Sequence, residues 1–340
     1  MPARFDILIG VGGIGAGMFV ELRGNRTLGR EESRAGRLLD RRDACKLHII
    51  AHHVRRLLGP SCRVLPAGCV GADESGRRVL DEMRAAGLDV SCVETVPDAP
   101  TLFSVCLLYP DGSGGNVTTD DSACSRVDTA FVARLEPEFR RHAGRGIALA
   151  APEVPLAARA ALLALATRHN FWRVAAFTAA EMPEALGLLR QVDLLVLNRS
   201  EAAAVAGVPA EGAAPAVLAE AAVARVRREQ PAIVVAVTAS REGSWLWDGA
   251  VLHHQPAAQV GVAGTAGAGD AFTGALIAGH AAGLAWPDCQ QLAALVAGVA
   301  IQSPHTINPD LDGAALRALA ARGPGWPVRV PVDAFLASLP

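Results

Sequence analysis

The stretch Val260–Gly279, with the sequence VGVAGTAGAGDAFTGALIAG, says most about how this chain folds and what it does. At its centre Gly267, Ala268 and Gly269 precede Asp270, and a run of small and apolar residues with helical spacing follows. Small residues let the backbone approach a ligand, and the free N–H groups of a helix's first turn attract anions. An acid at this place can accept a proton from a hydroxyl group while the amides stabilise a transferred phosphoryl group. A structural interpretation also exists, because Gly-rich turns often precede helices and Asp is common near their N-termini.

The longer string favours the catalytic interpretation. Gly264–Phe272 (GTAGAGDAF) resembles the C-terminal signature D-T-x-G-A-G-D-x-F of the ribokinase-like (PfkB) carbohydrate kinases. The resemblance implies that Asp270 is the catalytic base and that Gly267, Ala268 and Gly269 form the anion hole. The family's leading Asp is Gly264 here. Because that acid is often associated with a monovalent-cation site, the sequence puts potassium activation in doubt.

Composition sets the broad class of the protein. With 340 residues, 51% of them hydrophobic, the chain can form one large α/β domain or two smaller ones. A net charge of -2 gives no signal for nucleic-acid or acidic-membrane partners. The seven cysteines form no CxxC pair, so neither a disulfide framework nor a zinc site is indicated. No apolar run is long enough to span a bilayer, and residues 1–6 do not resemble a secretory leader, so we expect a cytoplasmic protein.

Lys46 is the only lysine in the chain, and all the other residues in the combined count of lysine and arginine are arginines. A compact ammonium group is not equivalent to a planar guanidinium, so Lys46 is a candidate functional residue. The alternative is that one lysine remains by chance.

The segment Gly10–Gly17 (GVGGIGAG) follows a short apolar strand and, taken alone, suggests a dinucleotide-binding oxidoreductase. That interpretation needs a second strand ending in an acid about twenty residues further on. Arg23–Arg37 is instead polar and has no strand pattern, which disfavours a dinucleotide-binding oxidoreductase. The family resemblance places this small-residue segment beside the sugar, so Gly12 and Gly13 are candidate substrate contacts. The Asp that commonly follows in the family is absent.

Asp40–Leu58 has apolar residues at helical spacing and is predicted to be a helix. In the family this helix starts with a G-G-x-x-x-N motif against the substrate, whereas Arg41–Lys46 here reads RRDACK. The charged replacement suggests a substrate more polar or more anionic than a simple pentose or hexose. Asp43, Lys46 and His48 are the candidate contacts, with a solvated helix face as the alternative.

A β-hairpin is predicted at Thr101–Tyr109 and Gly115–Thr119, joined by a turn at Pro110–Gly114. The resemblance implies that such strands, from about 12–35 and 92–122, form a lid over the sugar and exclude water from the phosphoryl donor. Asn116 matches the Asn of the lid's G-x-N pattern and is a candidate substrate contact, or else a turn former.

From Ile147 onward the chain alternates between strand and helix patterns, which predicts a parallel sheet covered by helices. The expected elements are strands at 147–151, 173–177 and 194–197 and helices at 156–169 and 183–191. Ligands gather beyond the carboxyl ends of such strands, where Glu153 is placed to face the substrate.

Two further motifs point to the nucleotide. Asn198 and Glu201 resemble the family's N-x-x-E motif, whose members organise magnesium and the donor phosphates, and Glu201 is expected to hold Mg²⁺ through water. The alternative is a helix cap with an acid in the first turn. Thr238, Ser240 and Gly243 resemble the family's T-x-G-x-x-G turn, with Ser240 in place of the middle glycine, and the resemblance implies that they lie near the nucleotide. A helix at 292–302 would flank the adenine, and 323–340 would be a terminal appendage with a short final helix.

We therefore expect a single ribokinase-like domain over residues 1–340, a three-layer α/β/α structure with a mainly parallel sheet and a small β-strand lid. Its expected activity is the ATP- and Mg²⁺-dependent phosphorylation of an alcohol group on a sugar or sugar-like compound. A homodimer through the lid is a further expectation. The competing hypothesis is a kinase-derived sugar- or nucleotide-binding regulatory protein without turnover, which the missing N-terminal Asp, the missing G-G-x-x-x-N motif and Gly264 favour.

Overall fold

The computed structural model describes residues 4–110 and 114–340. The strands are β1 (Ile7–Val11), β2 (Gly15–Leu22), β3 (Gly36–Ala44), β4 (Arg63–Gly71), β5 (Cys92–Val96), β6 (Leu102–Leu108), β7 (Gly114–Thr118), β8 (Gly146–Ala150), β9 (Trp172–Ala175), β10 (Leu194–Asn198), β11 (Val234–Thr238), β12 (Ser244–Trp247) and β13 (Leu252–Gln255). The helices are α1 (Lys46–Leu58), α2 (Glu74–Ala85), α3 (Thr129–Ala133), α4 (Glu136–Arg141), α5 (Leu156–Arg168), α6 (Met182–Ala185), α7 (Arg199–Ala206), α8 (Pro215–Val226), α9 (Ala268–Ala281), α10 (Trp286–Ala300), α11 (Gly313–Arg322) and α12 (Val330–Ala337).

Within the described residues, the large sheet has nine strands in the order β13-β12-β11-β10-β9-β8-β1-β4-β5. Its neighbours from β5 to β11 pair in parallel, and only β12 and β13 run antiparallel. Because both faces of such a sheet are covered, its strands are nearly continuous apolar runs, and all five residues of β1 are buried. The mainly parallel sheet predicted from the chain's alternation is confirmed.

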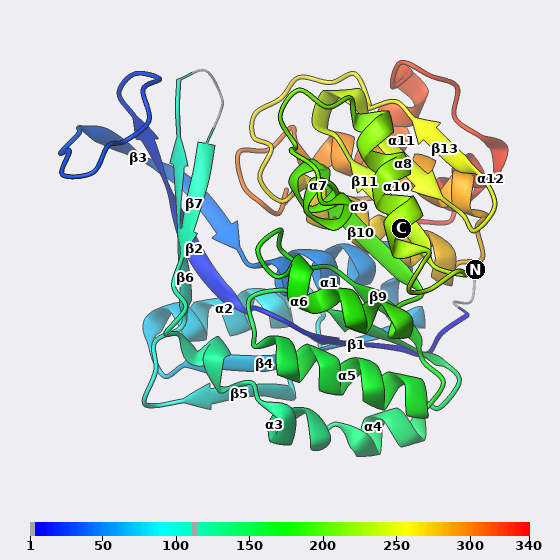
Figure 1. Ribbon diagram of the computed structural model, residues 1–340, viewed down its shortest axis with the longest axis horizontal. Helices are drawn as coiled ribbons and strands as arrows, with labels where there is room; N and C mark the ends of the chain where they lie inside the picture. Colours follow the sequence, from blue (N-terminus) through cyan, green and yellow to red (C-terminus); the bar gives the residue numbers. More distant parts are fainter. Residues whose placement is uncertain (1–3, 111–113) are drawn as a thin grey trace.

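Side chains of β1 alternate between two separate cores, one on each face of the large sheet. Leu8 packs with residues of α1, α9 and α10, whereas Ile7 and Ile9 pack with residues of α5, α7 and α8. Helices therefore cover both faces and give the three-layer α/β/α architecture (Figure 1).

The small sheet has four strands in the order β3-β2-β6-β7 and projects from one side of the body (Figure 1). β2 pairs antiparallel with β3 and parallel with β6, and β6 and β7 form the hairpin predicted from the sequence. The expected lid range 92–122 also contains β5, which belongs to the large sheet, and β3 lies outside the expected range 12–35. Residues 111–113 of the predicted hairpin turn lie outside the described residues.

The helix predicted from Asp40 begins only at Lys46. Residues up to Ala44 extend β3, because their backbone pairs with β2, which no local pattern reveals. The helix predicted at 183–191 is divided into α6 and a 3-10 segment, Leu186–Gln191. The C-terminal segment is packed rather than appended, since Val332, Phe335 and Leu336 of α12 are buried in the core. No helix among the described residues is long and apolar enough to cross a membrane.

Candidate active site

The first turn of α9 is set by a glycine in a left-handed conformation. Gly267 precedes the helix with φ +79°, and a Cβ atom there would collide with the carbonyl oxygen of Thr306. Only glycine meets both conditions without strain. The turn places Asp270 in the first turn of the helix, at its positive end. The N–H of Ala268 donates a 3.3 Å hydrogen bond to Thr265 O.

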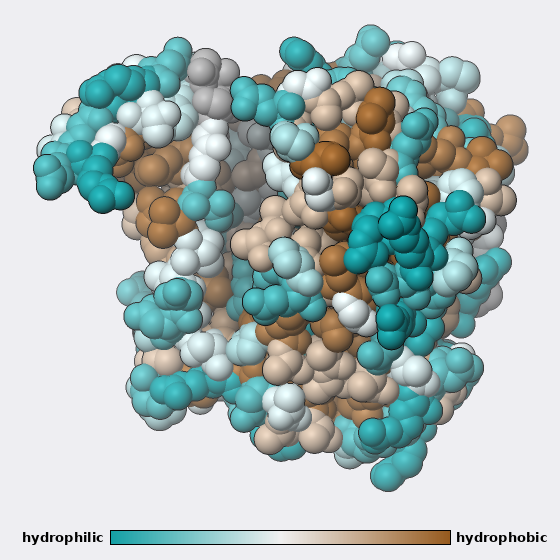
Figure 2. Space-filling model, in the orientation of Figure 1, coloured by the Kyte–Doolittle hydropathy of each residue, from teal (hydrophilic) through white to brown (hydrophobic). Residues whose placement is uncertain are grey.

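A cavity of about 510 Å³ lies between this turn, the start of α1 and the small sheet. Figure 2 shows the recess between the projecting sheet and the body. Its polar lining includes Asp43, Lys46, Ser104, Asn116, Glu153, Asp270 and Thr306. The small sheet, the loop after β8 and the starts of two helices thus meet in one cavity.

Lys46 and Asp270 form an ion pair in this cavity, with Nζ 3.9 Å from Oδ1. The attraction of Asp270 raises the pKa of Lys46 well above its usual range. Burial raises the pKa of Asp270, and Lys46 opposes this rise. Asp270 is held close to a fixed positive charge in a site with restricted access to water, since only 16% of its side chain is exposed.

Glu153 reaches the same cavity from the loop after β8, as the sequence suggested. Its backbone adopts φ +74°, and its Oε2 accepts a 3.2 Å hydrogen bond from the N–H of Lys46. Burial raises the pKa of Glu153 to about 7, against the lowering effect of Lys46. The Glu153 carboxyl therefore changes charge near neutral pH.

Asp43 faces the cavity from β3 of the small sheet. Its carboxylate accepts hydrogen bonds from Ser104 Oγ and, at 3.5 Å, from Cys106 Sγ. Burial raises the pKa of Asp43, and the hydrogen bond from Ser104 opposes the rise. Ser104 and Cys106 were not predicted as site residues. Their alternate positions on one strand were the available signal, because residues i and i+2 share a face.

The segment Ser303–Thr306 forms a wall between this cavity, which Pro304 and Thr306 line, and a second one, and it ties the small sheet to the turn before α9. Thr306 N–H donates to Arg42 O at 3.1 Å, and its Oγ1 accepts from Ala44 N–H at 2.9 Å. His305 Nδ1 accepts from Arg42 N–H at 2.8 Å. These bonds hold the end of β3 against the turn that begins α9.

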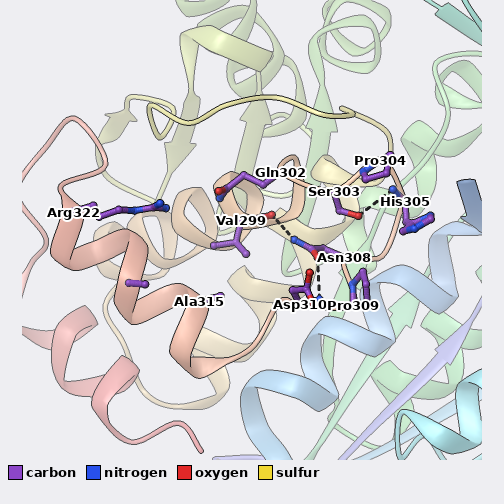
Figure 3. Close-up of a pocket in the computed structure, with 11 residues that line it drawn as sticks. Val299, Gln302, Ser303, Pro304, His305, Asn308, Pro309, Asp310, Ala315 and Arg322 are labelled. Carbon is purple, nitrogen blue, oxygen red and sulfur yellow. Dashed lines mark hydrogen bonds between the residues drawn. The ribbon is translucent and has the colours of Figure 1, made fainter.

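A second cavity, of about 390 Å³, lies behind this wall, between the end of α10 and α11 (Figure 3). Asn308 donates to Val299 O at 2.8 Å and accepts from Asp310 N–H at 3.0 Å. Ser303 Oγ accepts from His305 N–H at 3.1 Å. These polar side chains therefore hold the wall segment in shape.

Several predicted contacts lie elsewhere. Gly12 and Gly13 are buried under the cavity rather than lining it, and Ala268 and Gly269 are also absent from its lining. Asn116 lines it and donates to Thr118 Oγ1 at 3.1 Å. His48 is only 2% exposed and is not a lining residue, because its position on α1 turns it into the protein.

The residues expected near the nucleotide lie at the carboxyl ends of β10 and β11, outside both cavities. Asn198 and Glu201 form a capping box at the start of α7, and Asn198 is directly beside Thr238 in the sheet. Ser240 has φ +50° and Gly243 φ +89° in the next turn. The structural alternative for the N-x-x-E motif, a helix cap, is thus present. Among the described residues, no group of three or more His, Cys, Asp or Glu side chains is placed to hold a metal ion directly.

Comparisons with known proteins agree with this fold. The family model described as "pfkB family carbohydrate kinase" matches residues 49–312. The ribokinase of Giardia lamblia is 16% identical with a TM-score of 0.78, covering 92% of this chain and 99% of that one. A ribokinase from Cryptococcus neoformans var. grubii serotype A in complex with ADP is 21% identical (TM-score 0.75, 94% and 100% covered). Arabidopsis thaliana ribokinase complexed with ribose and ATP is 20% identical (TM-score 0.71, 93% and 98% covered). The predicted fold class is confirmed.

Proposed function

This chain belongs to the pfkB family of carbohydrate kinases, and we propose that its cavity transfers the γ-phosphoryl group of ATP to an alcohol group of a sugar or sugar-like substrate. The observation that carries the proposal is Asp270 at the start of α9, lining a cavity large enough for a small polyol. The ADP complex and the ribose–ATP complex of two proteins with this fold support the choice of donor and acceptor.

Asp270 would accept the proton of the attacking hydroxyl group. A base must be ionised to do so, and the Lys46 ammonium group 3.9 Å away favours the ionised form. The free N–H groups of a helix's first turn attract anions, so the amides of Gly267, Ala268 and Gly269 would stabilise the transferring phosphoryl group. The Ala268 N–H would exchange its long bond to Thr265 O for one to the phosphate.

The acceptor substrate would bind between the small sheet and the start of α1. Asp43, Lys46 and Asn116 line this part of the cavity, and Glu153 lies beside them. Gly13 would contribute indirectly, because its lack of a side chain lets Glu153 lie over the end of β1. Gly12 would do so by letting Ala151 and Leu47 pack closely against the same segment.

The donor phosphates would extend from the α9 turn toward the ends of β10 and β11, past Asn198, Glu201, Thr238, Ser240 and Gly243. Glu201 would hold Mg²⁺ through water, since the residue is only 9% exposed and its Oε2 already accepts a 2.7 Å hydrogen bond from the Asn198 N–H. Bound Mg²⁺ would neutralise charge on the donor phosphates.

The test is ADP production from ATP across a panel of sugars and nucleosides, with Asp270→Asn as the key variant. We expect the variant to lose at least a hundredfold in kcat, as is usual when a preorganised catalytic group is removed. Asp81→Asn is the control, because 74% of the Asp81 side chain is exposed on the surface. Near-normal turnover by the Asp270→Asn protein would exclude Asp270 as the base.

A sugar- or nucleotide-binding protein without turnover is the second candidate, because Gly264 and Arg41–Lys46 depart from the kinase signatures. It predicts that ligands raise the melting temperature while no ADP is formed with any acceptor. Measuring both ADP production and the melting temperature with the same panel of sugars and nucleosides distinguishes a kinase from a binding protein.

We also propose a homodimer through the small sheet. By register, Met18, Val20, Leu38, Val105, Leu107 and Val117 share one face of it. Leu38 and Val117 are 67% and 68% exposed, and part of the projecting sheet is visibly apolar (Figure 2). An apolar face of this kind is typical of a protein interface. Light scattering should give a dimer mass for the native protein and a monomer mass for the double variant Leu38→Asp/Val117→Asp. A native monomer would contradict this proposal.

A further inference from the structure

The cavity that holds Asp270 contains more acids than bases. Its described lining includes Glu21, Asp43, Glu153 and Asp270, and Lys46 is the one cation among these lining residues. Glu21 forms a 3.0 Å ion pair with Arg37 and is balanced there. Three carboxyl groups therefore share a single ammonium group.

The Lys46 ammonium group already has partners. It lies 3.9 Å from Asp270 Oδ1, and Glu153 and Glu201 add further attraction from the loop after β8 and from α7. Lys46 is also the first residue of α1, at the helix end where the dipole disfavours a cation. The surrounding acids, and not the helix, stabilise its charge.

The charged sequence Arg41–Lys46 suggested a substrate more polar or more anionic than a simple pentose or hexose, but one cation of this stretch lies outside the cavity. The Arg42 side chain is 80% exposed and lies 3.7 Å from Glu82 of α2, outside the cavity lining. Asp43, from the same stretch, faces inward and adds negative charge.

We propose that Lys46 is the counter-ion of Asp270 and not a receptor for an anionic group, so that the cavity accepts an uncharged sugar or an amino sugar and discriminates against sugar acids and sugar phosphates. This inference rests on the proposed kinase function of the same cavity. The physical reason is that an added carboxylate or phosphate on the acceptor would meet Asp43 and Glu153 in a site with restricted access to water, where these groups repel it strongly when they are ionised. Lys46 is then a positioning residue that holds the base.

The first experiment compares acceptors with matched skeletons. D-glucose, D-glucosamine, D-gluconate and D-glucose 6-phosphate form one set, and D-ribose, D-ribonate and D-ribose 5-phosphate form another. We expect kcat/KM for the uncharged or amino member to exceed that of the acid and the phosphate at least tenfold, and thermal shifts to rank in the same order. A sugar acid or phosphate as the best acceptor in either set would overturn the inference.

The thermal shifts keep the two proposals distinguishable. If no compound supports ADP formation, the proposed function fails, and the order of binding still tests the charge preference. If the charged members bind best, the charge preference fails whether or not turnover occurs. If no compound binds, the cavity is not a sugar site and both proposals fail.

The second experiment uses Lys46→Met with Arg42→Met as the matched control, which removes the same charge nearby but outside the cavity. On the best uncharged acceptor we expect Lys46→Met to lower kcat at least tenfold and to change its KM less than threefold, with partial recovery in Lys46→Arg. Arg42→Met should retain native kinetics. If Lys46→Met instead raises KM selectively for charged acceptors and preserves kcat on uncharged ones, Lys46 is an anion receptor and the inference is wrong.

Discussion

Glu153 occupies the space that a side chain on Gly13 would need. A Cβ atom at position 13 would lie 2.5 Å from Glu153 Cβ and would also collide with its carboxylate. Gly13 N–H donates a 2.9 Å hydrogen bond to Pro152 O, which fixes the two backbones together. The glycine at the end of β1 therefore determines where a cavity carboxylate lies.

Gly13→Ala should displace Glu153 and destabilise the protein by about 1–3 kcal/mol, as overpacked sites typically do. Since Glu153 Oε2 accepts from the Lys46 N–H, the start of α1 should shift as well and acceptor KM should rise. Urea denaturation and steady-state kinetics measure the two effects. Gly187→Ala is the control, because a Cβ atom there meets nothing within 4 Å. Equal stability of both variants would contradict this account.

The two glycines beside Asp270 should respond in opposite ways to alanine. Gly267→Ala forces φ +79° on a residue with a side chain and drives Cβ into Thr306, so we expect a loss of about 1–3 kcal/mol in unfolding free energy. Gly269 lies within α9 with open space around its Cβ position, so Gly269→Ala should keep or raise the stability by up to about 1 kcal/mol. Thermal or urea unfolding measures the stability of the two variants, and equal stability would contradict the prediction.

Thr306→Val removes the hydroxyl that accepts from the Ala44 N–H and leaves a similar shape. We expect a stability loss of about 1 kcal/mol, which is typical of one hydrogen bond. We also expect kcat/KM to fall, because Lys46 lies only two residues after Ala44. Ser338→Ala, which removes a hydroxyl bonded to Phe335 O at the far C-terminus, is the control and should leave kinetics unchanged. Native kcat/KM in Thr306→Val would show that this tie does not position the site.

Buried histidines on α1 should make the protein sensitive to acid. Burial lowers the pKa of His48 and of His53 to about 4, below the ordinary value of 6.5. The unfolded chain then binds more protons between these values, so stability is full above about pH 6.5 and is lost as pH falls toward 4. His48→Leu should flatten this dependence by up to about 1.4 kcal/mol per pH unit, measured by urea unfolding at pH 5 and 7.5. His254→Leu, at an exposed position, is the matched control for the loss of an imidazole group.

Glu153 should give the stability of the protein the opposite dependence on pH. Its folded pKa of about 7 lies above the ordinary value of 4.5, so its contribution to stability is present below pH 4.5 and is lost as pH rises through 7. Relative to Glu153→Gln, the native protein should therefore lose stability between pH 5 and 8. A constant difference between the two unfolding free energies over this range would exclude a carboxyl group that titrates near neutrality.

The sequence by itself determined the order of strands and helices after Ile147, the start of α9 and the pairing of Asn198 with Glu201. These features depend on local rules: the periodicity of apolar residues, helix capping and the conformations that glycine allows. Because such rules act within a few residues, the features that depend on them could be predicted from the sequence.

Only the tertiary structure decided which side chains meet. Lys46 lies against Asp270, Asp43 lies against Ser104 and Glu153 lies over Gly13, each across long stretches of chain. The strand Gly36–Ala44 likewise replaced the start of a predicted helix because its partner is β2. Strand pairing and the approach of charges depend on distant segments that come together only on folding, so residue order alone does not contain the geometry of the cavity.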